Sequence, residues 1–447
     1  MKPRSQNAPQ LRFFEKRLEE IIDGKHRLVS LSHIIPWDCM SRSLEEKFSE
    51  GIGRPALPAR LVVGAHYLKF MYNVSDEEFV ERWVENPYWQ YFCGEEYFRF
   101  DVPFNPSSFS KWRKRFSEED LETVFKASLA SLDNVGLLTD KETEVVNVDT
   151  TVQEKNIEFP TDRKSLFRVL IRLVRLAKEQ GVSLRQSYVR VAKSALRKSA
   201  TYASRKQHKL ANRYERKIRN YVGRVIRNIT RQIVGDQTKE EAFEYIFGIA
   251  ERVIAQSKDK NAKNKVYSVH ELHVECISKG KVHKKYEFGT KVSIVATSKS
   301  GFILSCSTVP GNPYDGSTLQ AGLDDAVRLL GRERIKRAYV DKGYRGHGFK
   351  GEIKVTHAGQ RPKEKKIKQE LRRRPAIESV ISHMKGTCRM DRNFLKGEKG
   401  DRINAIFAAA AHNLLLLLGV IYLHSFFCRL FRVFEPQKPI LCLKMAH

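Results

Sequence analysis

The sequence predicts a protein of the α/β class, with a helical N-terminal region, a mixed sheet, and a long basic helical insertion after the first strand. Three observations lead to this prediction. Helix-capping residues recur in the first 135 residues, β-branched runs begin after Glu144, and residues 161–234 combine helical spacing of apolar residues with a large positive charge. Strands that come first and then alternate with helices indicate a mixed sheet.

The composition is that of a globular protein with an anionic partner. The chain has 447 residues, enough for two or three structural units with a sizeable core, and 41% of them are hydrophobic. The formal net charge of +29 makes nucleic acid the expected partner, with a ribosomal or membrane-surface protein as the alternative. The seven cysteines include no C-x-x-C pair, so a reducing cytoplasm fits better than a disulfide framework or a zinc ribbon.

Residues 1–135 are predicted to form a helical domain. Ser75 followed by Glu78 is typical of a capping box, and Ser117 stands before an acidic run that suits the first turn of a helix. Lys111 and Arg113 belong to a basic strip that we expect to face DNA, although this strip alone is weak evidence for a helix-turn-helix.

Residues 161–262 are predicted to be a basic helical insertion. Between residues 161 and 234 there are 21 Lys and Arg but only three acids, an excess of 18 positive charges in 74 residues. Apolar residues recur there at helical spacing, so we expect long helices arranged as a hairpin. A solvated helical face is the usual meaning of a charge run, but the nearly uniform sign favours an anionic partner. The insertion residues that we expect to contact DNA are Arg205, Lys206, Arg216 and Lys217.

The sheet elements follow in order along the chain. The expected strands are 145–151, two strands within 286–311 joined by a turn at 298–301, a strand at 334–341, and a weaker strand at 351–357. The expected helices are 317–331 and 375–386, the second with a proline in its first turn. Residues 403–428 are apolar enough to span a bilayer, but their Asn and His residues favour a buried helix.

Three carboxylates are expected to meet at one edge of this sheet. Asp149 and Asp341 each follow an apolar run and are expected to end their strands, so both should emerge at the rim, where sites form in such sheets. Glu378, on the following helix, is the natural third member. Oxygen ligands in this number suit Mg²⁺ or Mn²⁺, and two such ions about 3.5–4 Å apart can activate an attacking hydroxyl and stabilise a leaving oxygen. Strand-end aspartates and ordinary ion pairs are the alternative explanation of the same three residues.

Two other groups of residues compete for a metal role. Asp315 lies among Asn, Pro and Gly residues and is interpreted as a turn residue. His270, His273 and Cys276 have spacing that would allow a contribution to a zinc site, but no second ligand pair follows nearby.

Several motifs occur in an order that is typical of one family. They are "DTT" at 149–151 with "QEKNIEFPTD" behind it, "ECISKGKVHKKYEFGTKVSI", "PGNPYDGSTL", "AYVDKGYRGH" and "RRRPAIESVISHMK". Together they resemble a bacterial insertion-sequence transposase of the DDE group, and most of all the insertion-sequence-five type. The resemblance covers roughly residues 35–420.

This resemblance implies a ribonuclease-H-like mixed sheet that carries an Asp-Asp-Glu triad. Asp149 matches the first aspartate, Asp341 the second, and Glu378 the glutamate. Leu371 departs from the family signature, which has a tyrosine at that position.

Basic residues around the triad are expected to hold phosphates. Arg374 precedes Pro375, which disfavours helical geometry, so it should reach the site from a loop. Lys385 follows Glu378 by nearly two helical turns and should share its face. For His383, a buried structural role is an equal alternative. The residues near the triad that we expect to contact DNA are Arg374, Lys385, His383, Lys342 and Arg345.

The resemblance further implies a transposase that binds the terminal inverted repeats of its element, cleaves strands with the help of two Mg²⁺ or Mn²⁺ ions, and joins the ends to target DNA. The expected partners are double-stranded DNA and further copies of the chain, in a homodimer or a higher synaptic assembly, with no membrane. A ribonuclease-H-like nuclease and an inactive DNA-binding descendant are the alternatives. The expected domains are 1–135, 140–424 with the insertion at 161–262, and a tail at 425–447 without an assigned role. The expected location is the cytoplasm, at the nucleoid.

Overall fold

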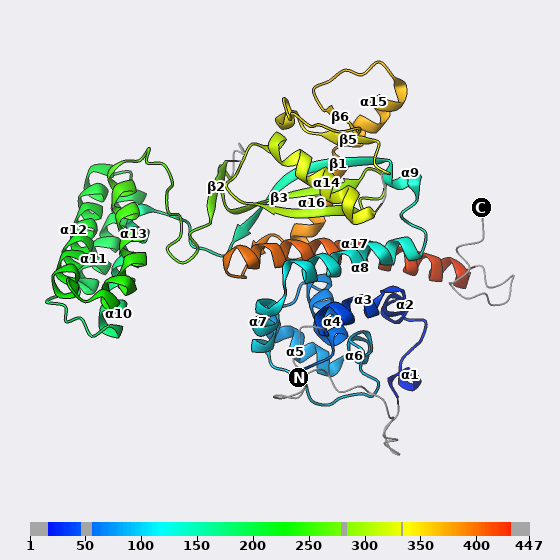
Figure 1. The fold of residues 1–447 in the computed structure, drawn as a ribbon, viewed down its shortest axis with the longest axis horizontal. Helices are drawn as coiled ribbons and strands as arrows, with labels where there is room; N and C mark the ends of the chain where they lie inside the picture. The colour runs from blue at the N-terminus through cyan, green and yellow to red at the C-terminus, as the bar shows by residue number, and fades with distance from the viewer. Residues whose placement is uncertain (1–16, 46–55, 279–283, 332–333, 431–447) are drawn as a thin grey trace. The chain divides into compact units, whose positions relative to one another are not determined.

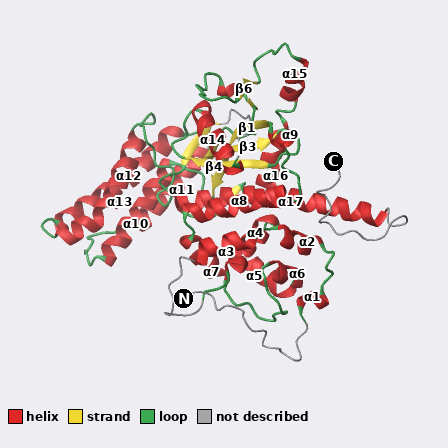
Figure 2. Ribbon diagram, turned by 45° about the vertical axis from the view of Figure 1, so that its right-hand side comes forward, coloured by secondary structure: helices red, strands yellow, loops and turns green. Residues whose placement is uncertain are grey.

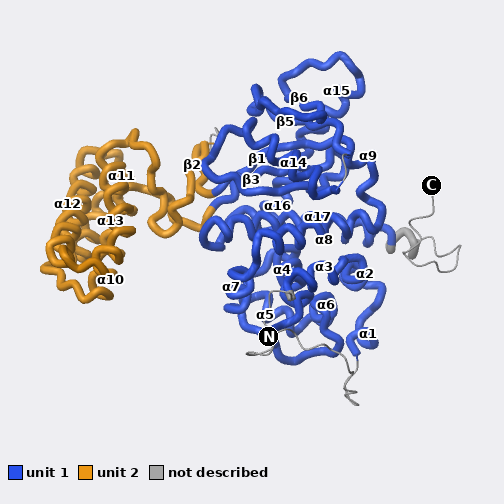
Figure 3. Tube along the Cα trace, viewed as in Figure 1, with its two compact units in different colours: residues 1–154, 290–447 blue, residues 155–289 orange. Residues whose placement is uncertain are grey.

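The computed structural model describes residues 17–45, 56–278, 284–331 and 334–430, and it divides into two compact units (Figure 3). The first unit contains residues 1–154 and 290–447, and the second contains residues 155–289. The expected tail at 425–447 enters the described residues only as the end of the last helix, and the rest of it lies outside them.

The N-terminal part of the first unit is helical, as its capping residues predicted. The Ser117 hydroxyl accepts the backbone N–H of Asp120, and the Asp120 carboxylate accepts the backbone N–H of Ser117, so a complete capping box opens α8. The Ser75 hydroxyl accepts the N–H of Glu78 at 3.1 Å and opens α5. The helices of this part are α1 (Leu18–Ile21), α2 (Arg27–Ile34), α3 (Trp37–Glu45), α4 (Ala59–Met71), α5 (Asp76–Glu85), α6 (Pro87–Phe92), α7 (Pro106–Arg115) and α8 (Glu118–Asn134).

A mixed sheet has the strand order β2-β3-β1-β5-β6, with β4 beside β3 and β7 beside β1. Most of this sheet belongs to the first unit, whereas β2 and the first residues of β3 belong to the second. β1, β5 and β6 are parallel neighbours, whereas β3 and β4 form an antiparallel hairpin, as predicted. The strands are β1 (Val145–Lys155), β2 (Glu275–Ser278), β3 (Tyr286–Thr297), β4 (Ile303–Val309), β5 (Arg337–Val340), β6 (Lys354–His357) and β7 (Arg392–Asn393). The connecting helices are α9 (Asp140–Thr143), η1 (Asp315–Thr318), α14 (Leu319–Leu330), η2 (Lys342–Tyr344), α15 (Lys365–Arg372), α16 (Ala376–Gly386) and α17 (Gly397–Leu430).

Helices α14 and α17 cover opposite faces of this sheet. On β4, the Ser305 hydroxyl donates to Asp325 of α14 at 2.8 Å, and the next residue, Cys306, donates its thiol to the carbonyl of Ala405 in α17 at 3.6 Å. Successive residues of a strand point to opposite faces, so the two helices lie on the two sides. Because α17 also contacts α4 and α8, it lies between the sheet and the N-terminal helices (Figures 1 and 2).

One hydrophobic core therefore joins the N-terminal helices to the sheet. Phe407 of α17 is fully buried, and the rings of His66, Phe70 and Phe116 lie around it at centroid distances of 5.0, 5.6 and 5.8 Å. Burial of one such aromatic side chain is worth about 1.5–3 kcal/mol. The helical region expected at 1–135 and the sheet region thus share packing through α17.

Helix α17 is buried over most of its apolar length, as the sequence predicted. From Gly397 to His424 it is long and apolar enough to cross a membrane, with a mean hydropathy of 2.1 in its most apolar window. Of that window, 61% is buried inside the protein, which is typical of a core helix.

The second unit contains four helices where the sequence predicted a hairpin: α10 (Asp162–Glu179), α11 (Val189–Ser204), α12 (His208–Ile233) and α13 (Gln237–Lys258). They enclose a core of their own, with Leu170, Val222 and Phe243 fully buried. Two amphipathic helices would leave part of their apolar stripes in water, and the additional helices cover them. The charged side chains are left on the outside.

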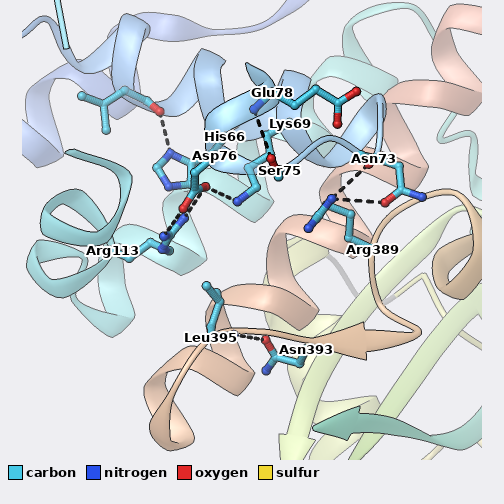
Figure 4. A network of polar contacts seen from close by, with 11 residues as sticks. His66, Lys69, Asn73, Ser75, Asp76, Glu78, Arg113, Arg389, Asn393 and Leu395 are labelled. Atoms are coloured by element: carbon cyan, nitrogen blue, oxygen red, sulfur yellow. Dashed lines mark hydrogen bonds and ion pairs between the residues drawn. The ribbon is translucent and has the colours of Figure 1, made fainter. Parts of the chain in front are cut away.

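A buried ion cluster fixes the N-terminal helices to one another (Figure 4). Asp76 accepts two hydrogen bonds from Arg113, at 3.0 and 2.6 Å, and one from Lys69. Although burial alone would raise the pKa of Asp76, these two cations lower it to about 2. Burial lowers the pKa of Lys69 to about 8. The carboxylate of Asp76 acts in the opposite direction, but the nearby cation Arg113 lowers the pKa of Lys69 further. Two buried cations thus depend on one carboxylate.

We therefore expect Asp76→Asn to lower the free energy of unfolding by about 3–5 kcal/mol, because it leaves Lys69 and Arg113 without their counter-charge. Glu77→Gln, at an exposed position of the same helix, should change it by less than about 0.5 kcal/mol. Denaturant unfolding followed by tryptophan fluorescence measures both. Equal stability of the two variants would contradict a structural role for the cluster.

Candidate active site

Asp149 and Asp341 lie side by side because β1 and β5 are parallel and in register. The last paired residues are Asn147 and Tyr339, and continuing this register by two residues brings Asp149 opposite Asp341. The prediction that Asp149 ends its strand is wrong, since β1 continues to Lys155. The edge opens at this point because the neighbouring strand β5 is short and stops just before Asp341.

Arg374 joins the three predicted carboxylates. It lies between α15 and α16, and α16 carries Glu378 in its first turn. Arg374 Nη2 is 2.6 Å from Asp149 Oδ2, and Nη1 is 3.8 Å from both Asp341 Oδ1 and Glu378 Oε1. The Arg374 side chain is 8% exposed, whereas Asp341 and Glu378 are 51% and 71% exposed. A buried guanidinium thus gathers acids that would otherwise repel one another.

The loop that carries Arg374 is tied to the sheet on both sides. Glu370 of α15 accepts hydrogen bonds from Arg337 Nε at 2.8 Å and from the Tyr339 hydroxyl at 2.7 Å, both on β5. The side-chain amide of Asn147 on β1 donates to the carbonyl of Arg373 at 3.4 Å. The position of Arg374 is therefore set by the two strands that also position the aspartates.

Backbone amides hold one oxygen of each aspartate. The N–H of Thr150 donates to Asp149 Oδ1 at 2.8 Å, and the N–H of Lys342 donates to Asp341 Oδ1 at 2.7 Å. These short local bonds restrict the rotation of each carboxylate, and the other oxygen of Asp149, Oδ2, is the one that Arg374 contacts.

The side chains at this edge are of the chemical type that binds a divalent cation. They include three carboxylates from three different elements, and carboxylate oxygens are the ligands that Mg²⁺ and Mn²⁺ prefer. In the described conformation the acids surround the guanidinium of Arg374, and no group of three or more Asp, Glu, His or Cys among the described residues is arranged around one ion-sized point. This also holds for His270, His273 and Cys276.

The remaining basic residues predicted near the triad lie on two elements. Lys342 and Arg345 are exposed, and they flank the short helix η2 directly after Asp341. Lys385 is partly buried on α16, the helix of Glu378. The structure thus brings Lys342 and Arg345 to the same edge as the acids.

His383 forms a pair with His412. Their Nδ1 atoms are 2.8 Å apart, and His412 Nε2 is 3.0 Å from the carbonyl of Gly301. A carbonyl can only accept, so His412 carries its proton on Nε2 and accepts at Nδ1 from His383. The pair joins α16, α17 and the turn between β3 and β4, which agrees with the structural alternative for His383.

The other residues predicted to contact DNA lie on the N-terminal helices and in the second unit. Lys111 is exposed on α7, whereas Arg113 is engaged with Asp76 and its side chain is only 11% exposed. In the second unit the four predicted residues are all exposed, at the end of α11 and on α12: Arg205, Lys206, Arg216 and Lys217.

A polar group that the sequence did not predict lies against Asp149. Asp315 does begin a helical turn, η1, but its Oδ1 also accepts from the Thr150 hydroxyl and from Lys291 Nζ, both at 2.8 Å. Thr150 and Asp315 are 165 positions apart in the chain. The only local signal was the position of Thr150 directly after Asp149.

Known proteins resemble the chain in two regions. A family model described as a transposase domain matches residues 16–115, and one described as a transposase DDE domain matches residues 257–414. A curated protein of Rhizobium meliloti, "Uncharacterized protein ORF8 in nfe locus", is 44% identical over 203 residues, which are 45% of this chain and 98% of that protein. No solved structure gives a significant match.

The buried histidine pair predicts a loss of stability in acid. Burial lowers the pKa of His412 from 6.5 to about 4, so below pH 6.5 the unfolded chain binds a proton that the folded chain excludes. The contribution is complete above pH 6.5 and is lost as the pH falls toward 4. His412→Gln should remove about 3 kcal/mol of the change in unfolding free energy between pH 7 and pH 4. The control His33→Gln, at an exposed position, should leave the profile parallel to wild type in denaturant titrations.

Proposed function

This chain belongs to the DDE transposases of insertion sequences, and on that premise we propose that it binds the terminal inverted repeats of its element, cleaves a DNA strand at each end, and transfers the freed 3′-hydroxyls to target DNA. The observation that carries the proposal is the meeting of Asp149, Asp341 and Glu378 around Arg374. The order of the motifs supports the insertion-sequence-five type.

The fold is compatible with this assignment. The DDE domain implies a ribonuclease-H-like core, and the sheet has an antiparallel hairpin on one side of β1 and parallel strands on the other. The aspartates lie on β1 and directly after β5, two strands that are adjacent at the centre of the sheet. Such a position fixes catalytic groups on rigid backbone rather than on mobile loops.

Asp149, Asp341 and Glu378 are the residues that would hold two Mg²⁺ or Mn²⁺ ions. The ions supply activation of the attacking hydroxyl and stabilisation of the leaving oxygen. The chain itself binds and orients the DNA strand. Exposed Lys342 and Arg345, directly after Asp341, can hold its phosphates, and Arg374 keeps the carboxylates together and lies within the same edge.

The second unit supplies DNA affinity in this proposal. The basic side chains of its four helices lie outside a packed apolar core, and many of them are exposed. Phosphate contacts give affinity and position without sequence preference. We assign sequence preference to the N-terminal helices, with Lys111 as a candidate contact, and we place the protein in the cytoplasm at the nucleoid as a homodimer or a higher synaptic assembly.

The catalytic assignment predicts a separation of cleavage from binding. Asp149→Asn, Asp341→Asn and Glu378→Gln should each reduce strand cleavage by at least about 10³-fold, because correct placement of the reacting groups accounts for much of the rate. Binding to DNA that carries the element ends should stay close to wild type. A labelled-end cleavage assay and a gel-shift titration measure the two properties.

Asp324→Asn is the matched control, since this carboxylate is exposed on α14 of the same unit. Its cleavage rate should equal that of wild type. If any of the three triad variants cleaves at the wild-type rate, that residue does not belong to the site. Joining of pre-cleaved ends to a target plasmid separates a transposase from a nuclease.

The role of the second unit predicts the salt dependence of binding. Changing Arg205, Lys206, Arg216 and Lys217 together to Glu should flatten the plot of log affinity against log salt by about 0.9 for each phosphate that the variant no longer neutralises. Binding to repeat-bearing and random DNA should weaken equally. A variant with Lys and Arg exchanged at the same four positions keeps the charge and should retain the wild-type slope. An unchanged slope in the Glu variant would assign the charge to another purpose.

A further inference from the structure

A chain of hydrogen bonds runs from Asp149 into the interior. The backbone N–H of Thr150 donates to Asp149 at 2.8 Å, and the hydroxyl of Thr150 donates to Asp315 Oδ1 at 2.8 Å. Lys291 Nζ donates to the same Asp315 oxygen at 2.8 Å and to the carbonyl of Pro313 at 2.6 Å. Thr150 and Lys291 are 7% and 6% exposed, whereas the Asp315 side chain is 35% exposed, so both donors are buried and the shared acceptor is partly open to water.

The loop of Asp315 also packs on the loop that carries Asp341. The Tyr314 hydroxyl donates to the carbonyl of Arg345. At Gly316 an added Cβ would lie 3.0 Å from the Cα of His347, so glycine permits a close approach of the two backbones there. Asp315 Oδ2 would lie 3.7 Å from a Cβ at Gly343, two residues after Asp341.

Tyr344 fills the space between these groups. Its side chain is 1% exposed, and burial, together with the negative charges of Asp149 and Asp315, raises its pKa. The phenol therefore stays protonated and neutral between the two carboxylates. Asp149 and Asp315 are thus both neighbours of one buried ring that belongs to the loop of Asp341.

We propose that Asp315 is a positioning residue of the active site: it orients Asp149 through the hydroxyl of Thr150 and holds the loop of Asp341 through its own loop. The inference rests on the proposed function, since it assigns Asp315 to the support of the same carboxylates. Asp315 lies in the motif "PGNPYDGSTL", but its sequence position gave only a turn role. The positioning role replaces the interpretation of Asp315 as a turn residue only.

The bonding of Asp315 distinguishes support from metal ligation. One of its oxygens already accepts two hydrogen bonds, and one of the donors is the buried ammonium of Lys291. The charge of Asp315, whose side chain is 35% exposed, is therefore matched by a buried cation, whereas Asp341 and Glu378 are 51% and 71% exposed at the edge. Groups that orient metal ligands typically contribute about 10–100-fold to metal affinity or activity.

The test uses Thr150, because its variants leave all ionised groups in place. Thr150→Val removes the hydroxyl at nearly constant shape, and Thr150→Ser keeps it. Mn²⁺ binding to the full chain without DNA is titrated by electron paramagnetic resonance, and cleavage is measured against Mg²⁺ concentration. Both are done at a temperature where melting curves show every variant folded. We expect Thr150→Val to weaken Mn²⁺ binding and raise the half-saturating Mg²⁺ about tenfold or more, and Thr150→Ser to match wild type.

A second pair tests Asp315 itself. Asp315→Asn keeps an oxygen that can accept from Thr150 and should retain most metal affinity, whereas Asp315→Ala should resemble Thr150→Val. Asp324→Asn is the exposed control. Equal damage from Asp315→Asn and Asp149→Asn would make Asp315 a ligand and overturn the inference. A Thr150→Val protein that matches wild type, or a Thr150→Ser protein as impaired as Thr150→Val, would also overturn it.

These outcomes are separate from a failure of the proposed function. If the proposed function fails, the wild-type chain itself neither binds Mn²⁺ nor cleaves element ends, or the triad variants keep both properties. If only the inference fails, the wild type does both, the triad variants lose them, and the Thr150 pair shows no difference.

Discussion

The mutual repulsion of three carboxylates is the constraint on which the site depends. Strand register brings Asp149 and Asp341 together, and the buried guanidinium of Arg374 lies among them and Glu378 and offsets their repulsion. Burying this cation without partners would be costly, so the acids and the arginine stabilise one another. The loop of Arg374 is in turn fixed by Glu370 of α15, which binds two side chains of β5.

Helix α17 connects the sheet that carries the site to the N-terminal helices of the first unit. It packs on the sheet face opposite α14, on α8 and on α4, so the N-terminal helices and the sheet share one core. His412 of α17 binds His383 of α16 and the carbonyl of Gly301. The β3–β4 turn lies so close to α16 that a Cβ added at Gly301 would be 2.9 Å from the side chain of Val380. Glycine, which has a φ of +75° here, permits this approach. The helix of Glu378 is thereby positioned from two sides.

Charge is used differently in the two units. In the first unit, buried cations such as Lys69, Arg113 and Lys291 are matched by carboxylates and serve packing and orientation. In the four helices α10 to α13 of the second unit, the core consists of apolar stripes and no basic side chain is buried. Buried charges require partners, whereas exposed charges of one sign repel one another and are available to an anion.

The sequence by itself determined the mixed α/β class of the fold and most of its elements, and it predicted three acids that lie together at one edge of the sheet. The helix caps at Ser75 and Ser117, the hairpin of β3 and β4 and the buried helix α17 follow from local spacing and end residues, which act between near neighbours in the chain. Tertiary structure decided what depends on distant segments. The end of β5 beside a longer β1 opens the edge, Arg374 meets Asp149 across 225 positions, and Asp315 reaches Thr150 across 165. The helical spacing of apolar residues predicted a hairpin of helices in the insertion. The structure has four helices there, and their apolar faces cover one another. Strand register and core packing set these contacts, and local spacing in the sequence does not show which distant segments meet.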